Sequence, residues 1–337
     1  MSRTPAAEVP RVTVIGAGVA GLASAIELAE RGVPVEIVDH GAGFGERAAS
    51  WYAGGMLAPW CERESTEPAV TTLGELALDW WPRHFPETVR NGTLVVAPPR
   101  DTAELARFAR RTERCERIGE NRIAELEPDL AGRFQTALFF ADEGHLDPRK
   151  ALAALVARLT ELGVPIRFDV EASEIAARNG ADRIVDCRGM GAADELPELR
   201  GVRGEMLLIR SHEVRLSRPI RLLHPRFPVY IVPREDGLYM VGATMIESAE
   251  TRPPSVRSVV ELLNAAYAVH PAFGEAEIIE IGVGVRPAFP DNLPHLVESG
   301  RTIHFNGLHR HGFLLSPALA RELADRILQP LPMETRP

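Results

Sequence analysis

The feature that most constrains the fold is a glycine-rich turn between a strand and a helix, within residues 11–40. Residues 12–15 are all β-branched, which is typical of a strand buried in a parallel sheet. The turn that follows is Gly16-Ala17-Gly18-Val19-Ala20-Gly21. The first glycine allows a tight turn, the second lets the backbone approach a pyrophosphate, and the third lets the helix pack closely on the strand. The pattern predicts a Rossmann-type unit whose helix N-terminus binds phosphate.

An acidic residue follows where a dinucleotide needs one. Asp39 lies 18 residues after Gly21, at the end of a second apolar run. A carboxylate at this position accepts hydrogen bonds from ribose hydroxyls. The alternative is a glycine turn in an ordinary βαβ unit, which would not require the strands, the helix and the acid to occur together. The segment by itself fits NAD and FAD equally well.

Composition excludes several other classes of protein. A chain of 337 residues predicts about two domains, and its net charge of −9 disfavours a nucleic-acid partner. No apolar run is long enough to span a membrane, and the first ten residues lack the apolar core of a signal peptide. The scattered Cys61, Cys115 and Cys187 predict neither disulfides nor a metal site. We therefore expect a cytoplasmic protein that binds no membrane and no metal.

The pattern along the chain predicts an α/β fold with two interleaved domains. A Rossmann-type nucleotide domain is expected over residues 10–84, 139–200 and 288–330. A mainly antiparallel β domain with helices, which would bind the substrate, is expected over 85–138 and 201–287. The ends, 1–9 and 331–337, are expected to be flexible tails. An NAD dehydrogenase usually keeps its Rossmann unit contiguous, so this interleaving favours FAD.

Two helices can be placed more closely. The charged stretch at 101–116 predicts one helix. Near the end of the chain, Ser316 is a favourable N-cap and Pro317 a favourable first helical residue, so a closing helix is expected to begin there. The positive end of this helix, near 313–317, could point at a flavin.

Five motifs in order carry a resemblance to a known family. They are the glycine turn with Asp39, "ASWYAGGMLAPW" at 49–60, "YIVPR" with "VGATM" at 230–245, "GVGVRPAFPDNLPHL" at 282–296 and "NGLHRHGFLLSPALA" at 306–320. Together they resemble the D-amino-acid-oxidase family of FAD enzymes, and within it the glycine oxidases. The segment 186–192 departs from the family pattern, because it keeps the glycines and lacks a tryptophan.

The resemblance implies which residues meet the substrate. Arg286 is expected to clamp a substrate carboxylate, although an arginine at the end of a strand can equally form a structural salt bridge. Tyr230 is expected to hold the same carboxylate, with core packing as the alternative. Met56 and Met245 are expected either to form walls of the pocket or to pack in the core. Arg310 is expected near the substrate, where it shields the site or supports the carboxylate.

The resemblance also implies a noncovalent FAD, since no cysteine follows Cys187 in the chain. His309 and His311 are expected to be structural, because hydride transfer from a neutral amine needs no protein base. Val170 is expected to lie on a strand and to contact adenine through its backbone. The expected FAD contacts are Gly16, Gly18, Val19, Ala20, Gly21, Asp39, His40, Ser50, Ala53, Gly54, Gly55, Met56, Leu57, Val170, Cys187, Gly189, Gly191, Arg286, His309, Arg310, His311, Gly312, Phe313 and Leu314.

The function that follows is oxidation of glycine by O2 to dehydroglycine (iminoacetate) and hydrogen peroxide. The imine would supply the thiazole of thiamine, which implies transfer to the thiazole-forming machinery. The sequence leaves three alternatives open. One is oxidation or dehydrogenation of another small amino acid, such as a D-amino acid, sarcosine or proline, with oxygen or a quinone as acceptor. The others are an NAD-dependent dehydrogenase and a non-catalytic flavin module. A homo-oligomer also stays open.

Overall fold

The computed structural model describes residues 9–329 apart from 44, 46, 173, 175–180 and 224–228. The first of its two large sheets has the strand order β16-β17-β9-β1-β2-β8. Five strands run parallel, and β16 pairs antiparallel with β17 at one edge. The strands are β1 (Val12–Ile15), β2 (Val35–Val38), β8 (Ile166–Arg167), β9 (Arg183–Asp186), β16 (His295–Ser299) and β17 (Thr302–Asn306).

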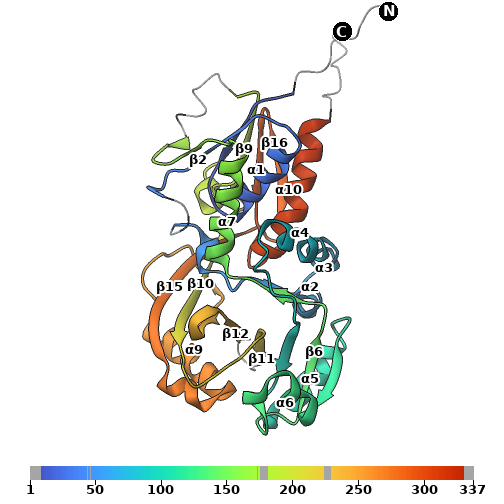
Figure 1. The fold of residues 1–337 in the computed structure, drawn as a ribbon. Coiled ribbons are helices and arrows are strands. Elements are labelled where there is room, and N and C mark those ends of the chain that lie inside the picture. Colours follow the sequence, from blue (N-terminus) through green and yellow to red (C-terminus); the bar gives the residue numbers. More distant parts are fainter. Residues whose placement is uncertain are drawn as a thin grey trace, which may run out of the picture.

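Helices pack against this sheet because their apolar faces need cover. Helix α1 (Val19–Glu30) is buried over most of its length and packs between α7 (Pro148–Glu161) and α10 (Gly312–Leu328), as Figure 1 shows. The shorter α2 (Pro59–Glu62), α3 (Pro68–Glu75) and α4 (Ala77–His84) form one group with α10. No helix in the described part of the chain is long and apolar enough to cross a membrane.

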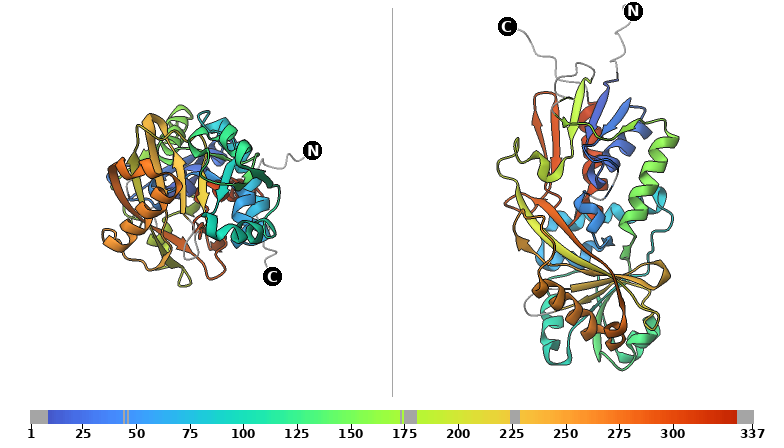
Figure 2. Two further views of the ribbon diagram at one scale, coloured as in Figure 1. Left: turned by 90° about the horizontal axis from the view of Figure 1, so that it is seen from below. Right: turned by 90° about the vertical axis from the view of Figure 1, so that its left-hand side faces the viewer.

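The second large sheet has nine strands and is antiparallel except for the pair β4–β11. Its longest pair, β10 and β15, runs from the level of the first sheet into the second (Figure 2). Helix α9 (Val256–Val269) packs against one face, and α5 (Thr102–Ala109) and α6 (Glu120–Leu126) lie near β6 and β5. The strands are β4 (Thr93–Val96), β5 (Glu116–Gly119), β6 (Thr136–Phe140), β10 (Arg200–Arg210), β11 (Ile220–Leu222), β12 (Val229–Pro233), β13 (Leu238–Gly242), β14 (Ile246–Glu247) and β15 (Glu277–Ala288).

A two-stranded sheet, β3 (Met56–Leu57) with β7 (Gly144–His145), accompanies the two large ones. The α/β fold with one mainly parallel and one mainly antiparallel sheet confirms the fold class predicted from the sequence. The predicted flexible tails, apart from Val9, lie outside the described residues.

Three local predictions were wrong. The predicted helix over 101–116 ends at Ala109, and Arg114 has a φ of 53°, which a helix does not tolerate. Val170 lies three residues beyond the end of β8, although its N–H still donates to the Asp39 carbonyl at 3.0 Å. The regular strand ends after Arg167, since Asp169 has a φ of 56°.

The closing helix begins at Gly312, so Ser316 and Pro317 lie inside it rather than at its start. Proline has no N–H, which leaves the Phe313 carbonyl, four residues earlier, without its helical donor. The Trp81 indole N–H donates to that carbonyl at 2.7 Å. A distant side chain therefore allows a proline within the first two turns of α10.

Candidate active site

The N-terminus of α1 is built to receive an anion. Gly16 has a φ of 104°, and a Cβ there would lie 2.7 Å from the Cys187 carbonyl oxygen. A Cβ on Gly21 would lie 1.9 Å from the Gly16 carbonyl oxygen, so both positions require glycine. The helix has no side-chain N-cap and no acidic residue in its first turn, although that turn is buried. Buried N–H groups at a helix start need a partner, and a pyrophosphate would supply one.

Asp39 lies directly after β2 and joins the two turns at this edge of the sheet. Its carboxylate accepts hydrogen bonds from the N–H groups of Ala17 and Gly41, both at 2.7 Å. His40 is exposed, and its Nδ1 lies 3.7 Å from the same carboxylate. Asp39 therefore already shapes the glycine turn from within the protein.

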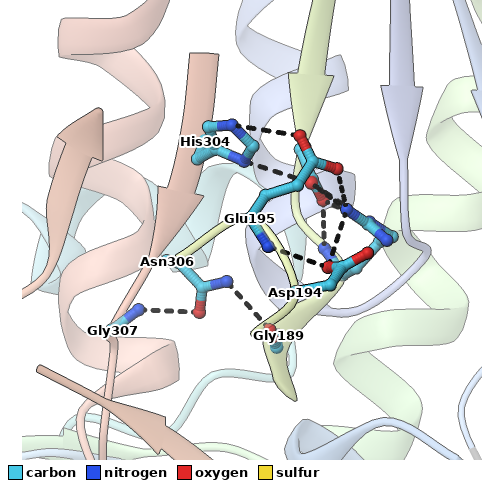
Figure 3. Close-up of polar contacts among 8 residues, drawn as sticks. Gly189, Asp194, Glu195, His304, Asn306 and Gly307 are labelled. Atoms are coloured by element: carbon cyan, nitrogen blue, oxygen red, sulfur yellow. Dashed lines mark hydrogen bonds and ion pairs between the residues drawn. The ribbon is translucent and has the colours of Figure 1, made fainter. Parts of the chain in front are cut away.

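The turn after β9 carries Cys187, Gly189 and Gly191, and Gly189 lies beside the end of β17 (Figure 3). The Cys187 N–H donates to the Ile15 carbonyl, which joins the turn to β1. Burial, followed by the Asp186 charge, raises the pKa of the Cys187 thiol, which favours a protonated and unreactive sulfur.

A side chain that the sequence analysis missed connects this turn to a second one. The Asn306 amide donates to the Gly189 carbonyl at 2.9 Å and accepts from the Gly307 N–H at 2.8 Å (Figure 3). Gly307 has a φ of 81°, and a Cβ there would lie 2.2 Å from the Phe289 ring. Asn306 opens the motif at 306–320, but asparagine is common in turns, so the sequence did not indicate this bridging role.

Buried charges beside the same turn are satisfied within the protein. Asp186 accepts three hydrogen bonds from the Arg188 guanidinium, and the His304 Nδ1 lies 3.1 Å from its carboxylate. Glu195 also pairs with Arg188, at 2.6 Å (Figure 3). The ligand atoms of Asp186, Glu195 and His304 lie close enough together to bind one metal ion, but the Asp186 carboxylate is already paired with the Arg188 guanidinium.

A pocket of about 450 Å³ brings the predicted substrate residues together. Its lining includes residues from β12, β15 and α9 of the second sheet layer and from the start of α10. All five predicted substrate residues line it: Met56, Tyr230, Met245, Arg286 and Arg310. So do several predicted FAD contacts: Ala53, Gly54, Gly55, His311, Gly312, Phe313 and Leu314.

The other predicted FAD contacts lie outside that lining. Ser50 lies close to the α1 N-terminus, where its Oγ accepts from the Val19 N–H at 3.4 Å. Leu57 is fully buried in β3. His309 has a φ of 49° and lines a neighbouring cavity of about 740 Å³, which also touches Met245 and Arg310.

Arg286 projects into the pocket without an acidic partner. Its Nη1 donates to the Thr244 carbonyl at 3.0 Å, and no carboxylate in the described part of the chain lies within salt-bridge distance of its guanidinium. Burial lowers the pKa of Arg286, and Arg310 adds to this while Tyr230 opposes it. Because arginine remains protonated all the same, the pocket holds an uncompensated positive charge. Arg286 therefore forms no structural salt bridge with the described residues, which was the alternative to a carboxylate clamp.

Tyr230 borders the same pocket from β12. A Cβ on Gly54 would lie 2.6 Å from its ring, so the glycine leaves room for the tyrosine. Burial raises the pKa of the Tyr230 hydroxyl, and the nearby Arg286 opposes this rise. Among the described residues the hydroxyl has no hydrogen-bond partner, and it remains protonated and able to donate to an anion.

Arg310 differs from Arg286 because the protein neutralises it. Its Nη2 lies 2.6 Å from Glu62 Oε2 and donates to the Ser65 hydroxyl at 2.7 Å. Glu62 also pairs with Arg221 at 2.9 Å. Burial raises the pKa of Glu62, but Arg310, Arg221 and His311 outweigh it and lower the pKa to about 2.

Glu62 and Arg221 were missed from the sequence. Arg221 is 3% exposed and lies within the apolar run Ile220–Leu222. A charge inside such a run was the available signal, because a buried arginine requires a partner. Glu62 carried no comparable signal, since its neighbours Arg63 and Glu64 are also charged.

The two histidines of this region are neutral at neutral pH. Burial lowers the pKa of His309 to about 4 and that of His311 to about 3, and the positive charge of Arg310 adds to the shift in both. The geometry therefore does not require His309 or His311 to transfer a proton near pH 7.

Comparisons with known proteins agree with the architecture and the site. The sequence model of the family described as FAD dependent oxidoreductase, DAO, matches residues 11–326. The chain therefore belongs to the D-amino-acid-oxidase family of FAD-dependent oxidoreductases. The uncapped, buried start of α1 and the glycine turns around it fit such a cofactor.

Individual relatives show which members of the family the chain resembles. The chain is 58% identical over 325 residues to the "Putative thiamine biosynthesis oxidoreductase ThiO" of Rhizobium etli, covering 94% of this chain and 96% of that protein. It is 28% identical to a glycine oxidase of Pseudomonas aeruginosa, with 94% of each chain covered. The crystal structure of glycine oxidase from Bacillus cereus superposes with a TM-score of 0.79 over 94% of each chain, at 23% identity, which is a likeness of fold.

Proposed function

We propose that the protein oxidises a small amino acid, with glycine as the substrate and O2 as the electron acceptor. The observation that carries the proposal is Arg286, a guanidinium in the pocket without an acidic partner among the described residues. A partly buried, uncompensated arginine favours an anion, and it binds a carboxylate through two parallel hydrogen bonds. Most of the free energy of binding of so small a substrate must come from its amine and its carboxylate.

The residues around the pocket then have distinct roles. Arg286 holds the carboxylate and Tyr230 donates a hydrogen bond to it, which orients the Cα–H bonds of the substrate. Met56 and Met245 limit the space beside Cα with apolar surface. Arg310 is already paired with Glu62, so its contribution is to close the pocket rather than to supply a free charge. Bound noncovalently, FAD would accept two electrons and a proton equivalent as hydride and pass the electrons on to O2.

The balance of the reaction fits an imine-supplying step. Glycine and O2 give iminoacetate and hydrogen peroxide, so one C–H and one N–H bond break while C=N and two O–H bonds form. The name of the 58% identical relative supports delivery of this imine to thiamine biosynthesis, and the name of the 28% identical relative supports glycine as the donor. We place this reaction in the cytoplasm, where the thiazole-forming enzyme would receive the imine.

The test of the proposal is the replacement of Arg286. Removing one partner of a buried ion pair costs about 3–5 kcal/mol. At about 1.4 kcal/mol per tenfold, Arg286→Ala should lower kcat/KM for glycine by about 10²–10³ or more. Arg286→Lys should also be poor, because a point charge does not reproduce the planar fork. Both variants should keep their FAD, since the guanidinium serves the substrate.

The measurements are flavin absorbance, steady-state kinetics and anaerobic bleaching by glycine on the same preparations. An FAD-loaded Arg286→Ala protein with near-wild-type kcat/KM would refute the carboxylate clamp. If sarcosine, proline or a D-amino acid bleaches the wild-type flavin and glycine does not, the substrate assignment is wrong while the family assignment stands.

A further inference from the structure

Arg286 is held in place by Thr244, a residue of the "VGATM" segment to which the family resemblance gave no role. The only hydrogen bond that its guanidinium makes to the described residues is the one that Nη1 donates to the Thr244 carbonyl at 3.0 Å. Thr244 lies two residues beyond the end of β13, and it lines the pocket together with its neighbours Ala243 and Met245. The position of this short segment therefore fixes both the arginine and part of the pocket wall.

Thr244 is fastened to β10 at three points. Its N–H donates to the Glu205 carbonyl at 3.2 Å, and its hydroxyl oxygen accepts from the Glu205 N–H at 2.9 Å. The same hydroxyl donates to the Glu205 carboxylate at 3.2 Å. Two of these three bonds belong to the hydroxyl group, so they depend on the residue being threonine or serine.

Glu205 is in turn immobilised. It is 2% exposed, and its Oε1 accepts from Arg203 Nε at 3.0 Å and from Arg203 Nη2 at 2.7 Å. Arg203 also donates to the carbonyls of Glu250 and Pro253. Burial raises the pKa of Glu205, but hydrogen bonds from Ser258, Arg203 and Thr244 outweigh it, so the pKa is lowered and the carboxylate stays ionised.

We propose that Thr244 is a positioning residue for Arg286: its hydroxyl locks the segment 243–245 onto Glu205, and its carbonyl then holds the guanidinium in the orientation that receives a carboxylate. The inference rests on the proposed function, because it concerns how the same carboxylate is bound. It adds a residue whose side-chain hydroxyl is bound to Glu205 and acts on the carboxylate through Arg286. Its effect should therefore fall on carboxylate affinity and leave the chemical step nearly unchanged.

The experiment compares Thr244→Val, which removes the hydroxyl, with Thr244→Ser, which keeps it. The FAD-loaded proteins are titrated with acetate, which offers the carboxylate without the amine, and binding is followed by the flavin absorbance spectrum. We expect the acetate dissociation constant to rise about tenfold in Thr244→Val, the loss typical of one ordinary hydrogen bond. KM for glycine should rise by a similar factor with little change in kcat, and Thr244→Ser should restore both.

Two further proteins make the result specific. Thr71→Val is the matched control, because Thr71 is a buried threonine whose hydroxyl donates to the Pro59 carbonyl, outside the lining of the pocket. Arg286→Ala reports on the clamp itself. If Thr244→Val does not give folded protein, Thr244→Ala removes the same hydroxyl and is measured in its place.

The outcomes separate the two proposals. Unchanged acetate affinity in Thr244→Val, with acetate binding lost in Arg286→Ala, overturns the role of Thr244 and leaves the clamp intact. Failure of Thr244→Ser to restore affinity, or an equal loss in Thr71→Val, also overturns it. Wild-type acetate affinity in Arg286→Ala removes the clamp and with it the basis for a positioning residue.

Discussion

The replacement Gly204→Ala should displace Arg286 without unfolding the protein. Gly204 lies in β10, opposite Gly284 of β15. A Cβ built on it would lie 2.2 Å from Arg286 Nη2, 2.3 Å from Cζ and 2.6 Å from Nη1. The backbone of Gly204 does not need a positive φ, so alanine suits the strand itself. The clash is with the far end of a flexible side chain, which can move.

The size of the displacement follows from these distances. Ordinary van der Waals contact begins at 3.4 Å, so the guanidinium must retreat by roughly 1 Å or rotate away from β10. That movement also strains its hydrogen bond to the Thr244 carbonyl. A misplacement of about 1 Å at a site of this kind can cost about 10²-fold in rate. We therefore expect kcat/KM for glycine to fall about 10²-fold in Gly204→Ala.

The assay measures kcat/KM, FAD content and the thermal unfolding midpoint on the same preparation. Gly119→Ala serves as the control, because Gly119 has a φ of −96° and a Cβ there would meet nothing within 4 Å. The control should behave as wild type in all three measurements. Gly204→Ala with full FAD content and kcat/KM within about threefold of wild type would contradict the reasoning, since the arginine would then tolerate displacement.

Two other perturbations test the cofactor region and the buried acids. Asp39→Asn should weaken FAD binding about tenfold or more, because the carboxylate orders the turns at Ala17 and Gly41 and would meet the ribose; unchanged affinity in a fluorescence titration would argue against this. Burial raises the pKa of Glu143 to about 8 from 4.5, so the neutral acid favours the folded state below pH 4.5 and this contribution is lost as pH rises toward 8. Glu143→Gln should therefore gain stability relative to wild type by up to about 1.4 kcal/mol per pH unit across that window, and parallel unfolding curves against pH would contradict it.

The sequence predicted best where short segments determine their own conformation. The turn Gly16–Gly21 needs glycine in part because of its own conformation: Gly16 has a φ of 104°, and a Cβ on Gly21 would meet the Gly16 carbonyl oxygen. Arg286 and Tyr230 could be selected by resemblance to a family, and the structure places both at one pocket.

The features that the sequence did not predict depend on contacts between distant segments. Ser316 and Pro317 predict a helix start, but α10 begins at Gly312 and contains the proline. The donor that replaces the missing N–H of Pro317 is the Trp81 indole, 232 residues before the carbonyl it binds, and the local sequence does not reveal it. The pairing of Glu62 with Arg221 spans 159 residues. A single sequence carries no signal for which of its many arginines and glutamates meet across such separations.

The β10 strand shows how one short segment can serve both sides of a site. Side chains alternate between the two faces of a strand, so Arg203 and Glu205 lie on the face opposite to Gly204. Leu207 and Ile209, of the same parity as Glu205, pack in the core that includes α9, so Glu205 reaches Thr244 from that face. Arg286 lies opposite Val202, next to Gly204 on the other face. Three consecutive residues of β10 therefore serve the clamp. Gly204 leaves room for the guanidinium on one face, and Arg203 and Glu205 fix its hydrogen-bond acceptor, the Thr244 carbonyl, from the other. A shift of register by one residue between β10 and β15 would disrupt both, because it would place a side chain where the glycine now lies.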